Sequence, residues 1–375
     1  MKKVLIINDN MNMGGIQKSL LNLLKATHDQ YKYTLLLFSK SGALLTEIPS
    51  DVKVISTRRV YRMLGLSREE LKRYPILFIT KYVLMKITKY STRRFTVGLL
   101  GIGQRPIKGF DAVISYSHLT GSHSFSGGCG DFALDKTICQ NKICCIHCDY
   151  LNSGLRSKSN DNEYLEFTKI ACCSESVKNR FSMSLVSIDE KTFVLRNFYD
   201  FSIVESGKEK IDELLDTSYI NLVCIARLSK EKGIDQILYA MHQAHRKDMR
   251  LYIVGDGPYK NELRKIIAAT ELSQQVFFMG EKTNPYNYVC SADYLILMSY
   301  HEAAPMVYDE AHILNTHIIS SETTSTSEML DDDDFICKTL DELSDCLLRL
   351  EKKELSQHSP MDNVMQTRQL EMLLE

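Results

Sequence analysis

The sequence has no tryptophan, only seven prolines, and no uncharged apolar run near the roughly 20 residues that a helix needs to cross a bilayer. These absences mark no biased segment, because apolar residues make up 44% and charged residues 25% of the chain, which is ordinary globular usage. Near the start only VLII is continuously apolar, too little for the core of an export signal. We expect a globular protein, soluble or peripheral to a membrane.

The sequence also has almost no net charge. The value of −1 gives no overall attraction to a polyanion, so no nucleic-acid partner is expected. It hides an asymmetry, since residues 58–108 contain 13 Lys or Arg against only Glu69 and Glu70. That segment carries +11 and the remainder about −12, so one region of the first half is basic enough to seek an anionic surface.

Eleven cysteines in a long chain without an export signal fit a reducing compartment, so the cytoplasm is the expected location. Zinc is an alternative for Cys145, His147, Cys148, Cys172 and Cys173, but the paired spacing of ordinary zinc sites is missing. We interpret these cysteines as small core residues on or beside buried strands. We expect no metal site and no cofactor.

The first half alternates strand-like and helix-like segments. A strand is predicted at 3–8, a Gly-Gly loop follows, and residues 16–27 have helical spacing of apolar residues. Further buried strands are predicted at 33–38, 111–116, 142–146 and 169–173. This alternation favours a parallel sheet covered by helices.

The pattern restarts in the second half, with strands predicted at 220–228, 251–257, 276–280, 294–298 and 317–321, and helices at 233–246, 259–270 and 305–314. A chain of 375 residues is long for one core. We predict an α/β protein with two Rossmann-like, doubly wound domains facing a central cleft. The predicted domains are 1–197 and 198–360, with a final helix at 361–375 that packs back on the first domain.

Three short segments carry candidate chemistry, the first two of them at predicted strand ends. Gly14 and Gly15 open a helix whose N–H groups favour phosphate, although a tight turn is as good an explanation. Arg227 and Lys232 follow a strand and could clamp a diphosphate, although solvated surface cations are the simpler alternative. In a third segment, an aspartate run at 331–334 could suggest a metal-dependent enzyme, but a solvated turn is the preferred interpretation.

The segment SYHEAAPMVYDE places Glu302 in a loop and Glu310 about one and a half turns into a helix that begins at Pro305. The amides of 303–306 could hold phosphate or sugar hydroxyl oxygens, and Glu310 could accept hydrogen bonds from a ribose diol. Two glutamates at this spacing also occur by chance.

A series of segments in this order resembles glycosyltransferase family 4, the group 1 retaining transferases of GT-B fold. The segments are VLIINDNMNMGGIQKSLLNL, CIHCDY, ACCSESVKNRF, VLRNFYD, CIARLSKEKGIDQIL, LYIVGDGPYKNELRK and the E-x7-E pair. The resemblance covers nearly the whole chain. It implies a nucleotide-sugar donor held mainly by the second domain and an acceptor bound by the first.

The resemblance also implies roles for particular residues. Arg227 and Lys232 match the diphosphate clamp, Glu302 the acid near the donor sugar, and Glu310 the ribose contact. His147 matches the first-domain histidine near the reacting sugar, a role for which His118 competes. The remaining donor-binding positions are Gly14, Gly15, Ala303, Ala304, Pro305 and Met306.

One departure from the family pattern affects the sugar pocket. The family has glycine and then a bulky apolar residue after the first glutamate, where this chain has Ala303 and Ala304. If that glycine has a positive φ, alanine costs about 1 kcal/mol. The donor sugar, a hexose or N-acetylhexosamine, is therefore left open, and uridine is the nucleotide that the resemblance implies.

Around residues 75–95 a helical projection places Lys81, Lys86, Lys89 and Arg93 on one arc of about 140°, with Ile76, Leu77, Val83, Leu84 and Ile87 on the other side. Such a helix can lie on an anionic membrane, where lipid-linked saccharide acceptors reside, on the inner face of the cell membrane. The alternative is a domain helix packed by its aliphatic side with solvated lysines.

The reaction implied is a metal-independent, retaining transfer to a glycan or lipid-linked saccharide in capsule or lipopolysaccharide synthesis. Two other functions stay open: a non-catalytic GT-B subunit that binds glycan or protein, and a GT-B sugar-nucleotide epimerase or hydrolase that needs no acceptor.

Overall fold

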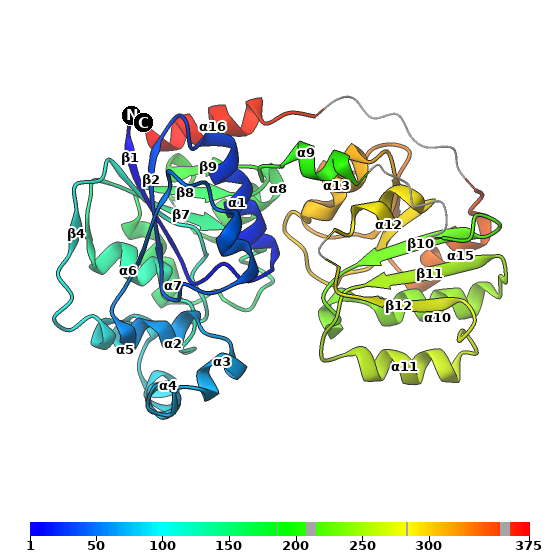
Figure 1. Ribbon diagram of the computed structural model, residues 1–375, viewed down its shortest axis with the longest axis horizontal. Coiled ribbons are helices and arrows are strands. Elements are labelled where there is room, and N and C mark those ends of the chain that lie inside the picture. The colour runs from blue at the N-terminus through cyan, green and yellow to red at the C-terminus, as the bar shows by residue number, and fades with distance from the viewer. Residues whose placement is uncertain (186, 208–214, 283, 353–360) are drawn as a thin grey trace. The chain divides into compact units, whose positions relative to one another are not determined.

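The computed structural model describes residues 1–185, 187–207, 215–282, 284–352 and 361–375. The chain forms two compact units (Figure 1). The first comprises Met1–Tyr199 with Asn363–Glu375, and the second comprises Asp200–Asp362. The sequence placed the first boundary between 197 and 198 and the start of the final segment at 361.

The first unit is built on a seven-stranded parallel sheet in the order β3-β2-β1-β5-β7-β8-β9. Its strands are β1 (Lys3–Asn8), β2 (Lys32–Leu37), β3 (Lys53–Ser56), β5 (Ala112–Ser115), β7 (Asn141–Ile146), β8 (Lys169–Cys172) and β9 (Thr192–Val194). Two further short strands, β4 (Ile107–Lys108) and β6 (Thr137–Ile138), pair with each other. Val4 to Ile7 are all fully buried, because helices cover both faces of a parallel sheet.

The helices of the first unit fall into two groups, those that flank the sheet and a run of four between β3 and β4. The flanking helices are α1 (Gly15–Thr27), α6 (Cys129–Asp135), α7 (Lys158–Glu166), α8 (Glu175–Ser184) and α16 (Val364–Leu374). The run consists of α2 (Arg62–Gly65), α3 (Arg68–Lys72), α4 (Pro75–Tyr90) and α5 (Arg93–Leu100). Short 3-10 helices lie at Ala43–Glu47, Arg59–Tyr61 and Asp189–Lys191.

The last helix, α16, belongs to the first unit. Its Leu370 and Leu373 are fully buried in the same apolar cluster as Val4 and Ile6. Lys2 Nζ donates to the carbonyl oxygen of Leu374 at 2.9 Å, so the two ends of the chain lie together, as Figure 1 shows.

The second unit has a six-stranded parallel sheet in the order β12-β11-β10-β13-β14-β15. Its strands are β10 (Ile220–Ile225), β11 (Met249–Val254), β12 (Val276–Gly280), β13 (Tyr294–Leu297), β14 (His317–Ser321) and β15 (Phe335–Cys337). Its helices are α9 (Phe201–Ser206), α10 (Ile234–Ala244), α11 (Lys260–Ala269), α12 (Tyr286–Ser291), α13 (Met306–Ile313), α14 (Thr326–Met329) and α15 (Leu340–Arg349), with a 3-10 turn at Lys230–Lys232.

The prediction of an α/β chain with two doubly wound, Rossmann-like domains is confirmed. In each sheet the strand order reverses beside the first strand, β1 in one unit and β10 in the other. Open parallel sheets bind ligands at the carboxyl ends of their strands where the order reverses. The two places to examine are therefore the ends of β1 and β5, and the ends of β10 and β13.

Candidate functional site

The ends of β10 and β13 bring two predicted site segments together in the second unit. The strands are parallel neighbours, with Leu222 opposite Tyr294, so the loops that follow them leave from the same edge of the sheet. The backbone N–H of Tyr300 donates to the Glu231 carbonyl oxygen at 2.9 Å, which joins the two loops directly.

Gly233 permits this close approach. Its φ is +60°, and a Cβ at this position would lie 1.9 Å from the carbonyl oxygen of Met298. A side chain would therefore both strain the backbone and push the two loops apart. The side-chain amide of Gln236 donates to the same Met298 oxygen at 3.2 Å and holds the start of α10 in place.

Lys232 and Glu302 form an ion pair, although they are 70 residues apart in the sequence. Their side chains are 26% and 15% exposed, so both are partly covered but remain in reach of a ligand in solution. Near Glu302, the hydroxyl of Tyr308 is hydrogen-bonded to Ser320. Burial, and to a smaller extent the charge of Glu302, raise the pKa of Tyr308 and keep this phenol protonated.

Arg227 follows β10 and is exposed. The polar side chain of Ser229 is the largest influence that lowers the pKa of Glu231, and the charges of Arg227 and Lys232 add to it. Both cations therefore act on one carboxylate between them. The backbone around Arg227 is fixed, because the N–H of Leu228 donates to the Asp256 carbonyl oxygen at 3.0 Å.

The segment after Glu302 leads into α13. Pro305 occupies the N-cap position of this helix and offers no side-chain acceptor to the first-turn N–H groups. Ala303 is 7% exposed and Ala304 and Met306 are partly buried. Glu310 is only 4% exposed and is therefore buried, whereas Glu302 in the preceding loop is partly exposed.

In the first unit, Gly14 and Gly15 lie between β1 and α1. Gly14 is extended with φ 179°, and a Cβ there would meet only the flexible end of Gln17 closely. A Cβ at Gly15 would meet nothing within 4 Å. Neither local packing nor positive φ requires glycine at these two positions, so the tight-turn explanation finds no support in the geometry.

His147 follows β7, and its Nε2 lies 3.0 Å from the carbonyl oxygen of Tyr116. Burial, with a contribution from the neighbouring His118, lowers the pKa of His147 to about 3. The ring is therefore neutral at physiological pH, with the proton on Nε2 donated to that carbonyl and the lone pair on Nδ1. Burial also lowers the pKa of His118 to about 4.

The basic segment differs from its prediction at Arg93. This side chain is fully buried, pairs with Asp131 at 2.8 Å and forms a second ion pair with Glu163. The prediction that Arg93 belongs to a membrane-facing arc is wrong, because its guanidinium neutralises two buried carboxylates. Lys81 is also partly covered, since its Nζ donates to the Met63 carbonyl oxygen at 2.7 Å.

On the rest of the basic helix, the lysines agree with the prediction and several apolar residues do not. Lys86 and Lys89 are exposed, as expected. Ile76, Val83 and Ile87 are exposed as well, although the sequence assigned them to a packed side if the helix served only as part of the domain.

The interpretation of residues 331–334 as a solvated turn is wrong for Asp334. Its side chain has no exposure, accepts from His312 Nε2 at 2.8 Å and accepts from the N–H of Ile318 at 2.7 Å. This aspartate fixes the start of β14 instead of facing solvent.

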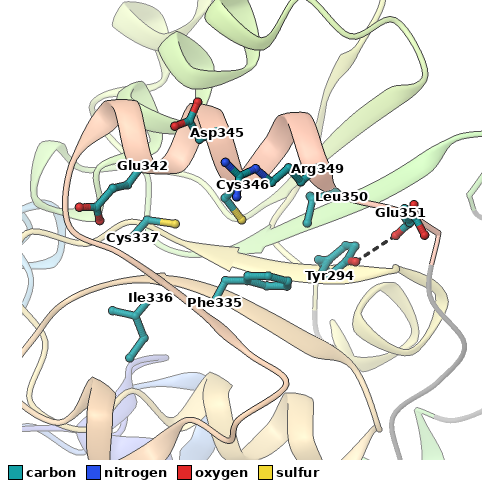
Figure 2. Close-up of a pocket in the computed structure, with 10 residues that line it drawn as sticks. All are labelled: Tyr294, Phe335, Ile336, Cys337, Glu342, Asp345, Cys346, Arg349, Leu350 and Glu351. Atoms are coloured by element: carbon teal, nitrogen blue, oxygen red, sulfur yellow. Dashed lines mark hydrogen bonds between the residues drawn. The ribbon is translucent and has the colours of Figure 1, made fainter.

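A separate pocket of about 530 Å³ lies in the second unit near Tyr294, at the amino end of β13 (Figure 2). Its lining residues are Tyr294, Phe335, Ile336, Cys337, Glu342, Asp345, Cys346, Arg349, Leu350 and Glu351. The Tyr294 hydroxyl donates to the Glu351 carbonyl oxygen at 2.9 Å. The predicted site residues are absent from this lining, and the pocket is at the opposite end of β13 from Glu302.

Within the described ranges, no group of three or more His, Cys, Asp or Glu residues could hold a metal ion. The same part of the chain contains no helix that is both long enough and apolar enough to cross a membrane. Cys145, Cys172 and Cys173, weighed as zinc ligands, are buried as thiols and not as disulfides.

Residues 206–366 match the family of glycosyl transferases group 1. The chain is 25% identical over 163 residues to the N-acetylgalactosamine-N,N'-diacetylbacillosaminyl-diphospho-undecaprenol 4-alpha-N-acetylgalactosaminyltransferase of Campylobacter jejuni, which covers 43% of this chain and 42% of that protein. It is 25% identical over 173 residues to the alpha-monoglucosyldiacylglycerol synthase of Streptococcus pneumoniae, covering 44% and 39%. The chain thus spans about two fifths of the length of these curated relatives.

Similar solved structures extend over the whole chain. HepE of Anabaena, in complex with UDP and glucose, has a TM-score of 0.66 and 16% identity, covering 100% of this chain and 93% of that one. TarM of S. aureus, a mutant in complex with Fondaparinux, alpha-GlcNAc-glycerol and UDP, has a TM-score of 0.60 and 12% identity, covering 93% and 92%. The expected GT-B fold class is confirmed by these neighbours.

Proposed function

We propose, from the match of residues 206–366 to the glycosyl transferases group 1 family, that the chain is a metal-independent, retaining hexosyltransferase. The donor is a nucleotide-diphosphate hexose or N-acetylhexosamine, with UDP as the nucleotide. The acceptor is a glycan or lipid-linked saccharide in cell-surface polysaccharide synthesis, at the inner face of the cell membrane. Two comparisons support this choice of substrates: the HepE structure contains UDP and glucose, and the name of the Campylobacter jejuni relative includes a diphospho-undecaprenol saccharide.

One observation carries the proposal: Lys232 and Glu302 are paired at the point where the strand order of the second sheet reverses, and Arg227 is exposed in the same loop as Lys232. A diphosphate leaving group develops negative charge as its bond to the sugar breaks. Fixed cations in a partly covered site stabilise that charge more than water does. Arg227 offers a planar fork of donors and Lys232 a point charge, so the two suit neighbouring phosphate oxygens.

The ion pair also suggests how donor binding begins. Glu302 holds Lys232 when no anion is present. A phosphate that takes over Lys232 would release the carboxylate of Glu302, which can then accept hydrogen bonds from hydroxyls of the donor sugar. The backbone N–H groups of Ala303, Ala304 and Met306, at the positive end of α13, would hold further oxygens, whereas Pro305 has no N–H to donate. Glu310 would accept hydrogen bonds from the ribose diol.

The first unit is assigned the acceptor. Gly14 and Gly15 leave the start of α1 without side chains, which allows a phosphate or acceptor oxygen to approach the N–H groups. Neutral His147 has a lone pair on Nδ1 that can accept a hydrogen bond from an acceptor or sugar hydroxyl. In the proposed same-face reaction, the acceptor hydroxyl attacks as the diphosphate leaves, and the hydroxyl proton passes to the leaving phosphate oxygen.

Substitution of the two cations tests this proposal. We expect Lys232→Ala and Arg227→Ala each to reduce turnover by about 10²–10³-fold, the usual loss for one stabilising donor. Lys230→Ala is the matched control, because Lys230 is an exposed cation in the same loop. UDP release with and without acceptor, and mass spectrometry of the product, provide the measurements. Equal activity of all three variants would remove the clamp from the mechanism.

Glu302→Gln separates binding from transfer. It removes the charge that holds Lys232, so UDP should bind more tightly while sugar transfer falls. Titration calorimetry with UDP measures the first effect and product formation the second. If donor alone yields an epimer or free sugar as fast as donor with acceptor, the transferase proposal fails in favour of acceptor-independent chemistry.

A further inference from the structure

Helix α4 exposes a continuous apolar stripe, which we call the α4 stripe and define as Ile76, Ile79, Val83, Ile87 and Tyr90. The spacing of three or four residues places all five on one narrow face of the helix. Their side chains are 80, 63, 48, 39 and 94% exposed, in that order. Figure 1 shows α4 at the edge of the first unit, outside α2 and α5.

Only one narrow side of α4 is packed. Its buried residues are Leu84 and Thr88, and the Thr88 hydroxyl is hydrogen-bonded to that of Thr96 on α5 at 2.9 Å. Among the exposed residues of the helix, Lys86 and Lys89 alone are charged. A long helix that shows water mostly apolar side chains marks an interaction surface, because isolated domains rarely expose such a contiguous patch.

Charge identifies the partner. From Lys72 to Lys108 the chain has nine Lys or Arg and no Asp or Glu. Arg93 and Arg94 form ion pairs with carboxylates elsewhere in the first unit. Lys86 and Lys89 are exposed beside the apolar side of α4. A second copy docked through the same stripe would place these lysines near their own counterparts. An anionic lipid surface offers both an apolar layer and negative charge.

We propose that α4 docks on an anionic bilayer, parallel to its surface, with the α4 stripe inserted among the lipids and Lys86 and Lys89 at the headgroups. The inserting face is the apolar stripe, not the basic arc that includes Lys81 and Arg93. The inference deepens the membrane location given in the proposed function by naming the surface that docks, and it does not rest on the proposed donor chemistry of the second unit.

The inner side of α4 connects this surface to the sheet of the first unit. Lys81 Nζ donates to the Met63 carbonyl oxygen, and its charge also acts on Asp9, which directly follows β1. Burial raises the pKa of Asp9, against the opposing effects of a hydrogen bond from Cys129 and the charge of Lys81. The inner side of α4 therefore acts electrostatically on the residue that follows β1, the strand whose end is proposed to bind the acceptor.

The test is co-sedimentation of the full chain with vesicles of phosphatidylcholine alone and of phosphatidylcholine mixed with phosphatidylglycerol. We expect binding to the mixed vesicles. The double variant Ile79→Asp with Val83→Asp should lower the partition coefficient at least about tenfold, because charge is excluded from the lipid layer. Lys86→Gln with Lys89→Gln should lose the preference for phosphatidylglycerol.

The matched control is Met365→Asp with Met372→Asp. These residues are 56 and 55% exposed on α16, another surface helix, and their substitution should leave vesicle binding unchanged. If the first double variant unfolds in a thermal melt, Ile76→Gln with Tyr90→Ser serves instead, since these two side chains are the most exposed of the stripe.

The proposal is overturned if the stripe variants bind vesicles as well as the unmodified chain does. It is also overturned if the unmodified chain does not bind vesicles. A concentration-dependent dimer in light scattering that the stripe variants abolish would assign the surface to a second copy and overturn it as well. UDP affinity, measured on the same proteins, should be equal in all of them. Failure of UDP binding would count against the proposed donor site without changing the vesicle result.

Discussion

The chain contains two groups of paired charges, one buried in the first unit and one partly exposed to solvent in the second. In the first unit, Arg93 pairs with Asp131 and Glu163, and the three side chains are 0, 1 and 5% exposed. In the second unit, Lys232 pairs with Glu302, and these side chains are 26 and 15% exposed. The first cluster must stay assembled, because separation would leave a buried charge without a partner. The second can exchange one partner for a ligand.

The difference shows that a cation at a loop or helix start is structural or functional according to the groups that cover it. Arg93 begins α5 and is covered by α6 and α7, which supply its two carboxylates. Lys232 ends a short turn at the carboxyl ends of the strands, where it pairs with the partly exposed Glu302.

The largest expected effect is on stability in the first cluster. Arg93→Met leaves Asp131 and Glu163 buried without their partner, so we expect a loss of about 3–5 kcal/mol in the free energy of unfolding. Arg94→Met is the control, because the adjacent Arg94 forms partly exposed ion pairs and should cost about 1 kcal/mol or less. Urea unfolding compares the two. Equal losses would erase the distinction between the clusters.

A second, smaller effect is expected at Gly233. Alanine there has an unfavourable positive φ and collides with the Met298 carbonyl oxygen. We therefore expect the free energy of unfolding to fall by at least about 1–2 kcal/mol and sugar transfer to be lost. Gly15→Ala meets open space and should change stability by no more than about 0.5 kcal/mol. Thermal unfolding measures both. A stable Gly233→Ala with normal turnover would show that the joined loops are not needed.

Breaking the Lys232–Glu302 ion pair should reduce the free energy of unfolding less than Arg93→Met or Gly233→Ala does. Lys232→Met leaves Glu302 partly exposed and hydrated, so the free energy of unfolding should fall by about 1 kcal/mol or less, whereas turnover collapses. Urea unfolding and an activity assay on the same preparation give the two values. A stability loss as large as that of Arg93→Met would make this pair structural too.

The smallest effect is a pH dependence from His312 and Asp334. Burial lowers the pKa of His312, but the hydrogen bond to Asp334 and the charges of Asp334, Asp331 and Asp309 together outweigh burial and raise this pKa. Burial raises the pKa of Asp334, but the hydrogen bond and charge of His312 together with backbone N–H donors outweigh burial and lower this pKa. The stabilisation from His312 is complete below the unfolded pKa of about 6.5 and is lost as pH rises through the raised value. That from Asp334 is present above about 3.9 and is lost as pH falls through the lowered value.

The pair should therefore stabilise the second unit most between about pH 4 and 6.5. The difference in Tm between the unmodified chain and His312→Gln should be greatest in this window and shrink at higher pH. A difference that is constant with pH would mean that the bond does not depend on the charge of His312.

Most of the fold could be predicted, because each central strand is an unbroken apolar run. The predicted strand at 3–8 coincides with β1, and the helix at 16–27 differs from α1 by one residue. The edge strands β3, β9 and β15 were missed, since each has only three or four residues and little apolar pattern.

The candidate site was predicted in part. The order of motifs indicated Lys232 and Glu302, and the structure joins them, but their roles in catalysis stay predictions. The burial of Arg93 could not be predicted, because its partners Asp131 and Glu163 are 38 and 70 residues away and no local pattern marks them. Tyr308 was overlooked near Glu302, and its place between the two glutamates in the sequence was the available signal.

The return of α16 to the first unit has a consequence for the chain's architecture. The side chain of Asn363 accepts from the Tyr199 N–H at 3.1 Å and donates to the Tyr199 carbonyl oxygen at 2.8 Å. The polypeptide thus leaves the first unit and re-enters it where Tyr199 and Asn363 are hydrogen-bonded to each other, so the second unit is an insertion within the first. Splicing residue 199 to 363 through a short linker would leave the first unit with every strand of its sheet.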